Sequence, residues 1–227
     1  MVGAERLSTT RWRNSRWLVI APHADDETLG AGALIAEAAA ANRLAGVAIL
    51  TDGTGSHPHA DNSSRARLAA MRREEAGAAC RILAGPGCRP IFLDWPDAHP
   101  PESGSDPWRA TVRDLAALCR RESVDAIAVT ASVEPHCDHA AASHLARAVA
   151  NAALRPVTVF EYCVWGAAPV ARCVVTRPLA PGRRRAALAV HRSQLTPAFG
   201  SGFRLPDAQR AMPDRDRLYL RARHDAP

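Results

Sequence analysis

Residues able to bind a metal or move protons first appear in a cluster near the start of the chain. The stretch "PHADDE" places His23, Asp25, Asp26 and Glu27 directly after the apolar run "WLVIA". Two adjacent carboxylates repel each other, and a bound cation relieves that repulsion. One carboxylate can then bind the cation while the other stays free to accept a proton. The plainer alternative is an acidic helix N-terminus, whose charge complements the helix dipole.

A second cluster, "HCDH", lies far downstream and contains His136 and His139. Two histidines and one carboxylate form catalytic zinc sites, which keep a fourth position open for water. The same ligand types also bind Fe2+ in non-haem iron oxygenases. A histidine taken alone is more often a surface or hydrogen-bonded residue. The two clusters together predict a metal centre if the fold brings them to one place.

The hydrophobic pattern predicts alternating strands and helices. Apolar runs of strand length begin with "WLVIA" and recur as "GVAILT", "RPIFLD", "DAIAVTAS" and "PVTVFEY", with a late strand "RLYLRAR". Amphipathic helices are predicted over residues 29–44, 65–83, 108–121, 139–154 and 185–194. This alternation predicts an α/β fold, a Rossmann-like three-layer α/β/α sandwich with a mostly parallel sheet. We expect one domain over residues 1–227, with residues 1–15 as a flexible N-terminal tail.

Polar loops follow four of these strands, at the same end of the predicted sheet. They read "PHADDE", "TDGTGSHPH", "DWPDAHP" and "SVEPHCDH". Ligands of open α/β sheets bind at the carboxyl ends of the parallel strands. We therefore expect the four loops to meet at one rim and to form the metal centre there. The loops over residues 52–64 and 94–107 are long, which is typical of functional loops.

These motifs together resemble the LmbE-like, or PIG-L-type, family of zinc-dependent N-deacetylases. That family has PHPDDE near its start and HPDH later, and the similarity continues through "TDGTG", "MRREEAGAACRILAG", "WPDAH" and "HRSQ". The resemblance implies that His23, Asp26 and His139 bind Zn2+, with Fe2+ as an alternative metal.

The resemblance also implies the catalytic residues. Asp25 corresponds to the general base, His136 to the residue that stabilises the oxyanion, and Asp138 to the aspartate that orients this histidine and keeps it charged. Ala24 and Cys137 stand where the family has proline. Neither position supplies a ligand in the family, so we expect the metal centre to survive. Metal binding by Cys137 is the alternative.

The implied reaction removes an acetyl or other acyl group from the amide nitrogen of an N-acetylglucosamine-type sugar conjugate. Arg72 in "MRREEA" and Asp97 in "WPDAH" match family positions that contact the sugar. These residue types suit hydrogen bonds to sugar hydroxyls. For Arg72 the alternative is a helix-surface ion pair with Glu74 or Glu75. For the whole chain the alternatives are a non-haem Fe(II) enzyme or a non-catalytic sugar-binding relative.

Composition limits the possible chemistries, the compartment and the partners of the protein. The chain has 227 residues, a formal net charge of +6 and no lysine, which excludes Schiff-base and P-loop lysine chemistry. Its six cysteines form no CxxC pair and resemble small buried apolar residues rather than a disulfide framework. Free thiols of this kind are typical of a reducing compartment. No apolar run is long enough for a signal-peptide core or a membrane span. We expect a cytoplasmic enzyme acting on a small molecule, without nucleic-acid or membrane partners, and we leave assembly into a homo-oligomer open.

Overall fold

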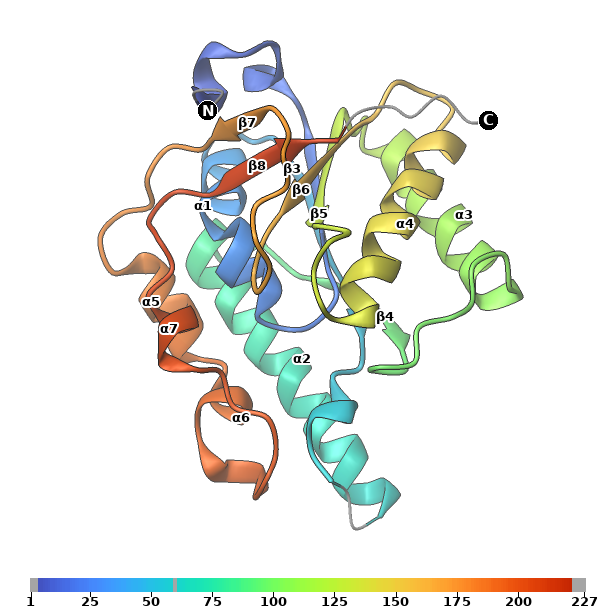
Figure 1. The fold of residues 1–227 in the computed structure, drawn as a ribbon, viewed down its shortest axis with the longest axis vertical. Helices are drawn as coiled ribbons and strands as arrows, with labels where there is room; N and C mark the ends of the chain where they lie inside the picture. The colour runs from blue at the N-terminus through green and yellow to red at the C-terminus, as the bar shows by residue number, and fades with distance from the viewer. Residues whose placement is uncertain (1–3, 59–60, 222–227) are drawn as a thin grey trace.

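A mixed sheet with helices on both faces forms the body of the protein (Figure 1). Residues 4–58 and 61–221, which the computed structural model describes, contain one eight-stranded sheet in the order β1-β7-β8-β6-β5-β2-β3-β4. Its strands are β1 (Glu5–Arg6), β2 (Trp17–Ala21), β3 (Leu44–Thr51), β4 (Ile91–Trp95), β5 (Ala126–Thr130), β6 (Thr158–Tyr162), β7 (Cys173–Val175) and β8 (Arg217–Leu220). The longer helices are α1 (Asp26–Ala40), α2 (Asn62–Ala84), α3 (Asp106–Arg121) and α4 (Cys137–Ala152).

Five neighbouring strands run parallel. β2 pairs in parallel with both β3 and β5, and the parallel block continues to β4 on one side and β6 on the other. β8 then lies antiparallel to β6 and β7. The carboxyl ends of the five parallel strands therefore meet at one edge, where the long polar loops begin.

Side chains of the central strands alternate between two separate cores, which explains the three layers. Trp17, Val19 and Ala21 of β2 face the core that includes α1 and α2, whereas Leu18 and Ile20 face the core that includes α3 and α4. Successive side chains of a strand point to opposite faces, so a fully apolar strand must be covered on both. Figure 1 shows these helix pairs on opposite sides of the sheet. The predicted sandwich is confirmed.

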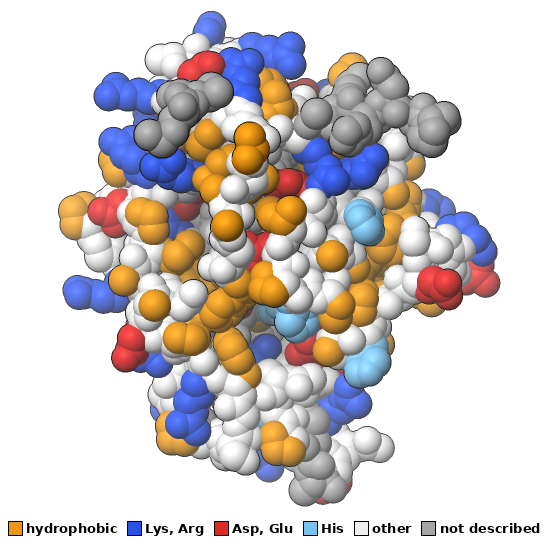
Figure 2. Space-filling view, viewed as in Figure 1, with side chains coloured by type: hydrophobic (Ala, Val, Ile, Leu, Met, Phe, Trp, Pro, Cys, Tyr) orange, Lys and Arg blue, Asp and Glu red, His pale blue; other side chains and the backbone are white. Residues whose placement is uncertain are grey.

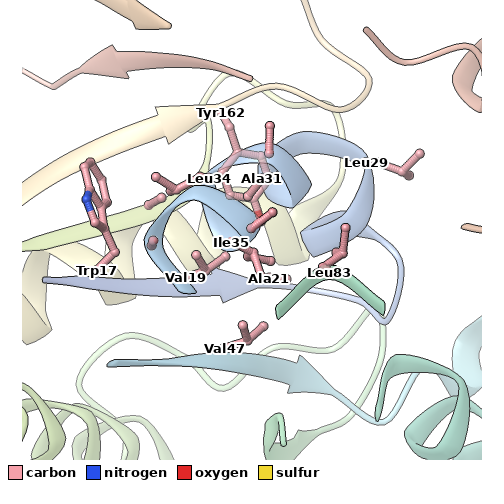
Figure 3. Packing of buried hydrophobic residues seen from close by; sticks show 14 of the residues in the cluster. Trp17, Val19, Ala21, Leu29, Ala31, Leu34, Ile35, Val47, Leu83 and Tyr162 are labelled. Atoms are coloured by element: carbon pink, nitrogen blue, oxygen red, sulfur yellow. The ribbon is translucent and has the colours of Figure 1, made fainter. Parts of the chain in front are cut away.

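The helix that begins at the first metal motif is held close to the sheet by a glycine. The ring of Tyr162 lies against α1 (Figure 3), and a Cβ on Gly30 would come within 2.1 Å of its Cδ2 atom. The hydroxyl of Tyr162 also donates a hydrogen bond of 3.0 Å to the carbonyl oxygen of Ile20 in the neighbouring strand β2. Gly30 thus permits the close approach that fixes the start of α1 over the sheet.

The structure shifts the bounds of three predicted helices by up to three residues and differs more from the prediction at the other two. The helix predicted over 29–44 begins earlier and ends at Ala40, because Asn42 adopts a left-handed conformation (φ 54°) and Leu44 already begins β3. The helix predicted over 185–194 is two short helices, α5 (Arg183–Ala189) and α6 (Arg192–Leu195). A last short helix, α7 (Asp207–Arg210), precedes β8.

Part of the predicted flexible tail belongs to the folded body. Residues 5–6 form β1 beside β7, and Leu7 and Trp12 are buried in the core, with 3% and 4% of their surface exposed. The ring of Trp12 packs edge-on against Phe160, with 5.0 Å between centroids. Residues 1–3 of that tail and residues 222–223 of the predicted last strand lie outside the described residues. No helix among the described residues is long and apolar enough to cross a membrane.

Candidate metal centre

A cavity of about 310 Å³ opens at the carboxyl ends of the parallel strands. The loop after β2 and the start of α1 supply His23, Asp25 and Asp26, and the start of α4 supplies His139. The space-filling view shows histidine and acidic side chains beside a hydrophobic patch in the lower half of the face (Figure 2). The remaining lining residues are Gly55, Ser56, Arg72, Asp97, Ala98, His136, Trp165, Gln194 and Phe203.

Three side chains from the two sequence motifs present their donor atoms to one point. One oxygen of Asp26, Oδ2, lies 3.1 Å from Nδ1 of His23 and 3.2 Å from Nε2 of His139. Ligands at about 2.0 Å from a tetrahedral zinc ion are about 3.3 Å apart, so these separations suit a shared ion. The ligand atoms of all three residues lie within 4.8 Å of one another.

Each of the two histidines has a carboxylate beside its other ring nitrogen. Nε2 of His23 lies 3.0 Å from Oδ2 of Asp138, and Nδ1 of His139 lies 3.4 Å from Oε2 of Glu134. Metal-binding histidines usually donate their second ring N–H to such a carboxylate, which fixes the tautomer and aims the first nitrogen at the ion. Both ring nitrogens of the fully buried His139 lack a well-aligned hydrogen bond. These residues therefore fit a divalent cation.

The electrostatics of the three residues also favour bound positive charge. Burial by itself would raise the pKa of Asp26, but the charges and hydrogen bonds of His139 and His23 hold it well below its usual value. Burial would likewise lower the pKa of His139, yet Asp26 and Glu134 raise it to about 9. The carboxylates thus attract protons onto the histidines, and a cation with deprotonated ligands can replace those protons.

Asp25 lies next to the three potential ligands, without sharing their contacts. Its backbone has φ 138°, which L residues rarely adopt, and its N–H donates a 2.9 Å hydrogen bond to Oε2 of Glu27. Burial, and then the neighbouring charge of Asp26, raise the pKa of Asp25 to about 7. Asp25 is 3% exposed and lines the cavity, so its carboxyl group can exchange a proton with a group bound there.

His136 is placed differently from the sequence expectation. The carboxylate of Asp138 lies 3.7 Å from Nδ1 of His136 but only 3.0 Å from Nε2 of His23. The backbone N–H of Asp138 donates to Nδ1 of His136 at 3.3 Å, which leaves Nε2 as the protonated nitrogen of a neutral ring. Burial, and then the charge of His23, lower the pKa of His136. We therefore interpret His136 as a neutral N–H donor.

Arg72 and Asp97 both line the cavity. The guanidinium of Arg72, 3% exposed as a residue, donates a 2.9 Å hydrogen bond to the Ser56 hydroxyl. Among the described residues Arg72 forms no ion pair with Glu74 or Glu75, and the Glu75 carboxylate instead accepts hydrogen bonds from the backbone and hydroxyl of Ser193. Asp97 accepts from the backbone N–H of Gly55 at 2.9 Å. Arg72 and Asp97 thus form a polar wall beside the potential metal ligands.

Several residues around the centre were not singled out from the sequence. Glu134, Ser56, Trp165 and Phe203 carry no recognisable spacing; only the position of Glu134, two residues before "HCDH", is a signal. Cys137, the alternative ligand, is exposed and lies outside both groups of described residues whose donors converge.

The "HRSQ" segment supports the loops from behind. His191 lies 3.5 Å from the Glu27 carboxylate, and Gln194 donates to the carbonyl oxygen of Ala24. His57 contacts the Ser56 hydroxyl at 2.8 Å, whereas His59 lies outside the described residues.

Solved structures share this fold. The A40926 pseudoaglycone deacetylase is 19% identical, with a TM-score of 0.66 over 94% of this chain and 99% of that one. N,N'-diacetylchitobiose deacetylase from Pyrococcus horikoshii, bound to an inhibitor, is 22% identical, with a TM-score of 0.62 over 83% of this chain and 74% of that one. A zinc-inhibited form of teicoplanin deacetylase is 18% identical, with a TM-score of 0.63 over 94% and 100%. At these identities the likeness shows the fold.

A match at the level of sequence identifies the family. No individually curated protein matches this chain significantly. The family model described as PIG-L, GlcNAc-PI de-N-acetylase, matches residues 18–150, which is more than half of the chain and includes both metal motifs. The protein therefore belongs to the PIG-L family of de-N-acetylases.

Proposed function

We propose that this protein is a metal-dependent N-deacetylase that hydrolyses the acetamide of an N-acetylglucosamine-type sugar conjugate, with zinc as its metal. The observation that carries the proposal is the shared Asp26 oxygen, 3.1 Å from His23 and 3.2 Å from His139. These three residues would hold the ion. Bound there, zinc would lower the pKa of a water ligand to about 7 and polarise the amide carbonyl.

Asp25 moves the protons in this proposal. Its carboxylate is buried in the cavity beside the three ligands, and its pKa is raised to about 7 by burial and by Asp26. As a carboxylate it accepts the proton of the attacking water, and as the acid so formed it returns that proton to the departing amine nitrogen. A proton-transfer residue with a pKa close to the working pH performs both steps well.

His136 stabilises the negative charge that develops on the amide oxygen. Its Nδ1 accepts the backbone N–H of Asp138, so its Nε2–H is the available donor. A fixed donor aimed at a developing oxyanion typically contributes ~10²–10³ in rate. We thus assign His136 a role as a neutral donor, in place of the charged group that the resemblance implies.

The polar wall of the cavity, formed by Arg72 and Asp97, binds the sugar in this proposal. Arg72 donates to Ser56 at 2.9 Å, and Asp97 faces the same space. A fixed guanidinium and a carboxylate can together bind vicinal hydroxyls, one as donor and the other as acceptor. Structural neighbours named as N,N'-diacetylchitobiose, A40926 pseudoaglycone and teicoplanin deacetylases support an amino-sugar substrate. One of them is described as a zinc-inhibited form, which supports zinc binding by proteins of this fold.

The test is a panel of N-acetylglucosamine conjugates incubated with the zinc-loaded protein. Free acetate and newly formed primary amine should appear in equal amounts, and both should stop when a chelator removes the metal. Asp25→Asn should bind zinc and release neither product. If every conjugate is inert with the metal bound, the proposed reaction is wrong and a non-catalytic sugar-binding role remains. Loading with Fe2+ in an oxygen electrode tests the iron enzyme, which requires oxygen uptake.

A further inference from the structure

A second set of metal donors lies on the opposite side of the His23 ring. His23, Asp97, His136 and Asp138 each offer one donor atom, and these four atoms all lie within 4.8 Å of one another. Nε2 of His23 is 3.0 Å from Asp138 and 3.3 Å from Asp97, and Nδ1 of His136 is 3.7 Å from Asp138. The donors of the first set use the other nitrogen of His23, Nδ1.

These separations match those of donors around one small cation. Tetrahedral zinc with bonds of about 2.0 Å separates its ligand atoms by about 3.3 Å, close to the distances between His23, Asp97 and Asp138. Asp97 and Asp138 are 6% and 1% exposed as residues, so their charges are weakly screened by water. The set contains two carboxylates, whereas the first set contains one.

The donors come from three loops that the fold holds together. His23 follows β2, Asp97 follows β4, and His136 and Asp138 stand at the start of α4. Gly55 fixes Asp97 through a 2.9 Å hydrogen bond, and the backbone N–H of Ala98 donates to Asp138 at 2.9 Å. The carboxylates are therefore already oriented, and binding an ion requires little rearrangement.

We propose that a second divalent cation binds among His23, Asp97, His136 and Asp138, so that the His23 ring bridges two ions. Coordination through both ring nitrogens requires the ring to lose its remaining N–H proton to solvent. It also replaces the hydrogen bond between His23 and Asp138 and the backbone N–H that His136 accepts. Because of these costs the second site fills after the first, at higher metal concentration.

Occupancy of this second site has a functional consequence, which rests on the proposed deacetylase reaction. The second ion engages Asp97, which faces the sugar, and His136, which donates to the oxyanion. The Asp97 carboxylate is then unable to serve a substrate in the cavity. Activity should rise as the first equivalent of zinc binds and fall as the second binds.

Metal counting tests the second site without any use of activity. Metal-free protein is dialysed against increasing Zn2+, and bound metal is measured by elemental analysis. We expect two equivalents for the parent chain and one for Asp97→Asn and for His136→Gln, with unchanged affinity at the first site. Loss of an outer partner costs a metal site roughly 10–100-fold in affinity, and loss of a direct ligand should cost the second site at least that much.

His99→Gln is the matched control. His99 is exposed in the same loop as Asp97, and its side chain contacts the backbone carbonyl of Asp97 at 3.1 Å rather than a donor of the second site, so this variant should still bind two equivalents. Circular dichroism verifies that each variant is folded. The two conservative substitutions, Asp97→Asn and His136→Gln, change the site from different loops, so a shared loss of the second equivalent does not depend on one loop. A parent chain that binds one equivalent up to millimolar zinc would overturn the proposal, as would two equivalents in both variants.

Discussion

Glu134→Gln changes the support of one potential metal ligand while leaving the ligand itself in place. The Glu134 carboxylate accepts hydrogen bonds from the backbone N–H groups of Val164, Trp165 and Gly166, at 2.9 to 3.2 Å, and its Oε2 lies 3.4 Å from Nδ1 of His139. Glutamine has the same shape, but its amide nitrogen can only donate. If the amide oxygen stays with the backbone, the amide N–H faces His139 and reverses the tautomer of its ring.

The size of the effect follows from these contacts. A reversed tautomer places the His139 proton on Nε2, the nitrogen that lies 3.2 Å from Asp26. Loss of an outer carboxylate usually weakens metal binding by about 10–100-fold, or about 1.4–2.7 kcal/mol. Hydrogen bonds to a charged acceptor exceed neutral ones by about 1 kcal/mol each, so three backbone bonds predict a loss of about 1–3 kcal/mol in the free energy of unfolding.

Two measurements on each variant separate these effects: zinc affinity by competition with a chelating dye, and the free energy of unfolding of the metal-free protein. Glu161→Gln is the control, because Glu161 is also buried and paired, with Ser143 and Arg221, but contacts no histidine within the described part of the chain. We expect both variants to lose stability and only Glu134→Gln to lose zinc affinity. Equal zinc affinity in Glu134→Gln and the parent chain would refute the assignment of Glu134 as the partner of His139.

Three further outcomes follow from the structure. His136→Ala should keep the first equivalent of zinc and lose ~10²–10³ in kcat, as for other oxyanion donors; steady-state kinetics with metal analysis checks this. The rate should rise with pH as Asp25 loses its proton, because burial and Asp26 raise its pKa to about 7, and a bound cation should shift this midpoint downward; a pH–rate profile at two metal concentrations measures both. Gly30→Ala should destabilise the fold by about 1–3 kcal/mol or more, since its Cβ would meet the Tyr162 ring at 2.1 Å, and thermal unfolding should show the loss.

Hydrophobic periodicity predicts the central layers because it is set by burial. The strand Trp17–Ala21 is apolar throughout since both faces of the sheet are covered, and its pattern is visible without any knowledge of neighbours. The edge strand β1 and its neighbour β7 are only 2 and 3 residues long, too short to show a period. Leu7 and Trp12 are buried by contacts with distant strands, which local sequence does not reveal.

The sequence predicts the potential metal ligands but not the carboxylates that support them. His23 and Asp26 stand three residues apart at a strand end, and together with the downstream histidines this spacing predicts a shared ion. Glu134 reaches His139 because the loop after β5 folds back onto residues 164–166, a contact made across the sheet edge. The pairing of Asp138 with His23 likewise joins residues that are 115 positions apart. Spacing within one motif cannot predict contacts between motifs.

The central claim is that one divalent ion joins the two motifs through His23, Asp26 and His139. Anomalous diffraction from crystals grown with one equivalent of zinc tests it most directly. We predict a peak bonded to Nδ1 of His23, an oxygen of Asp26 and Nε2 of His139, at about 2.0–2.2 Å from each. A peak that lacks Asp26 or either histidine among its ligands would contradict the account.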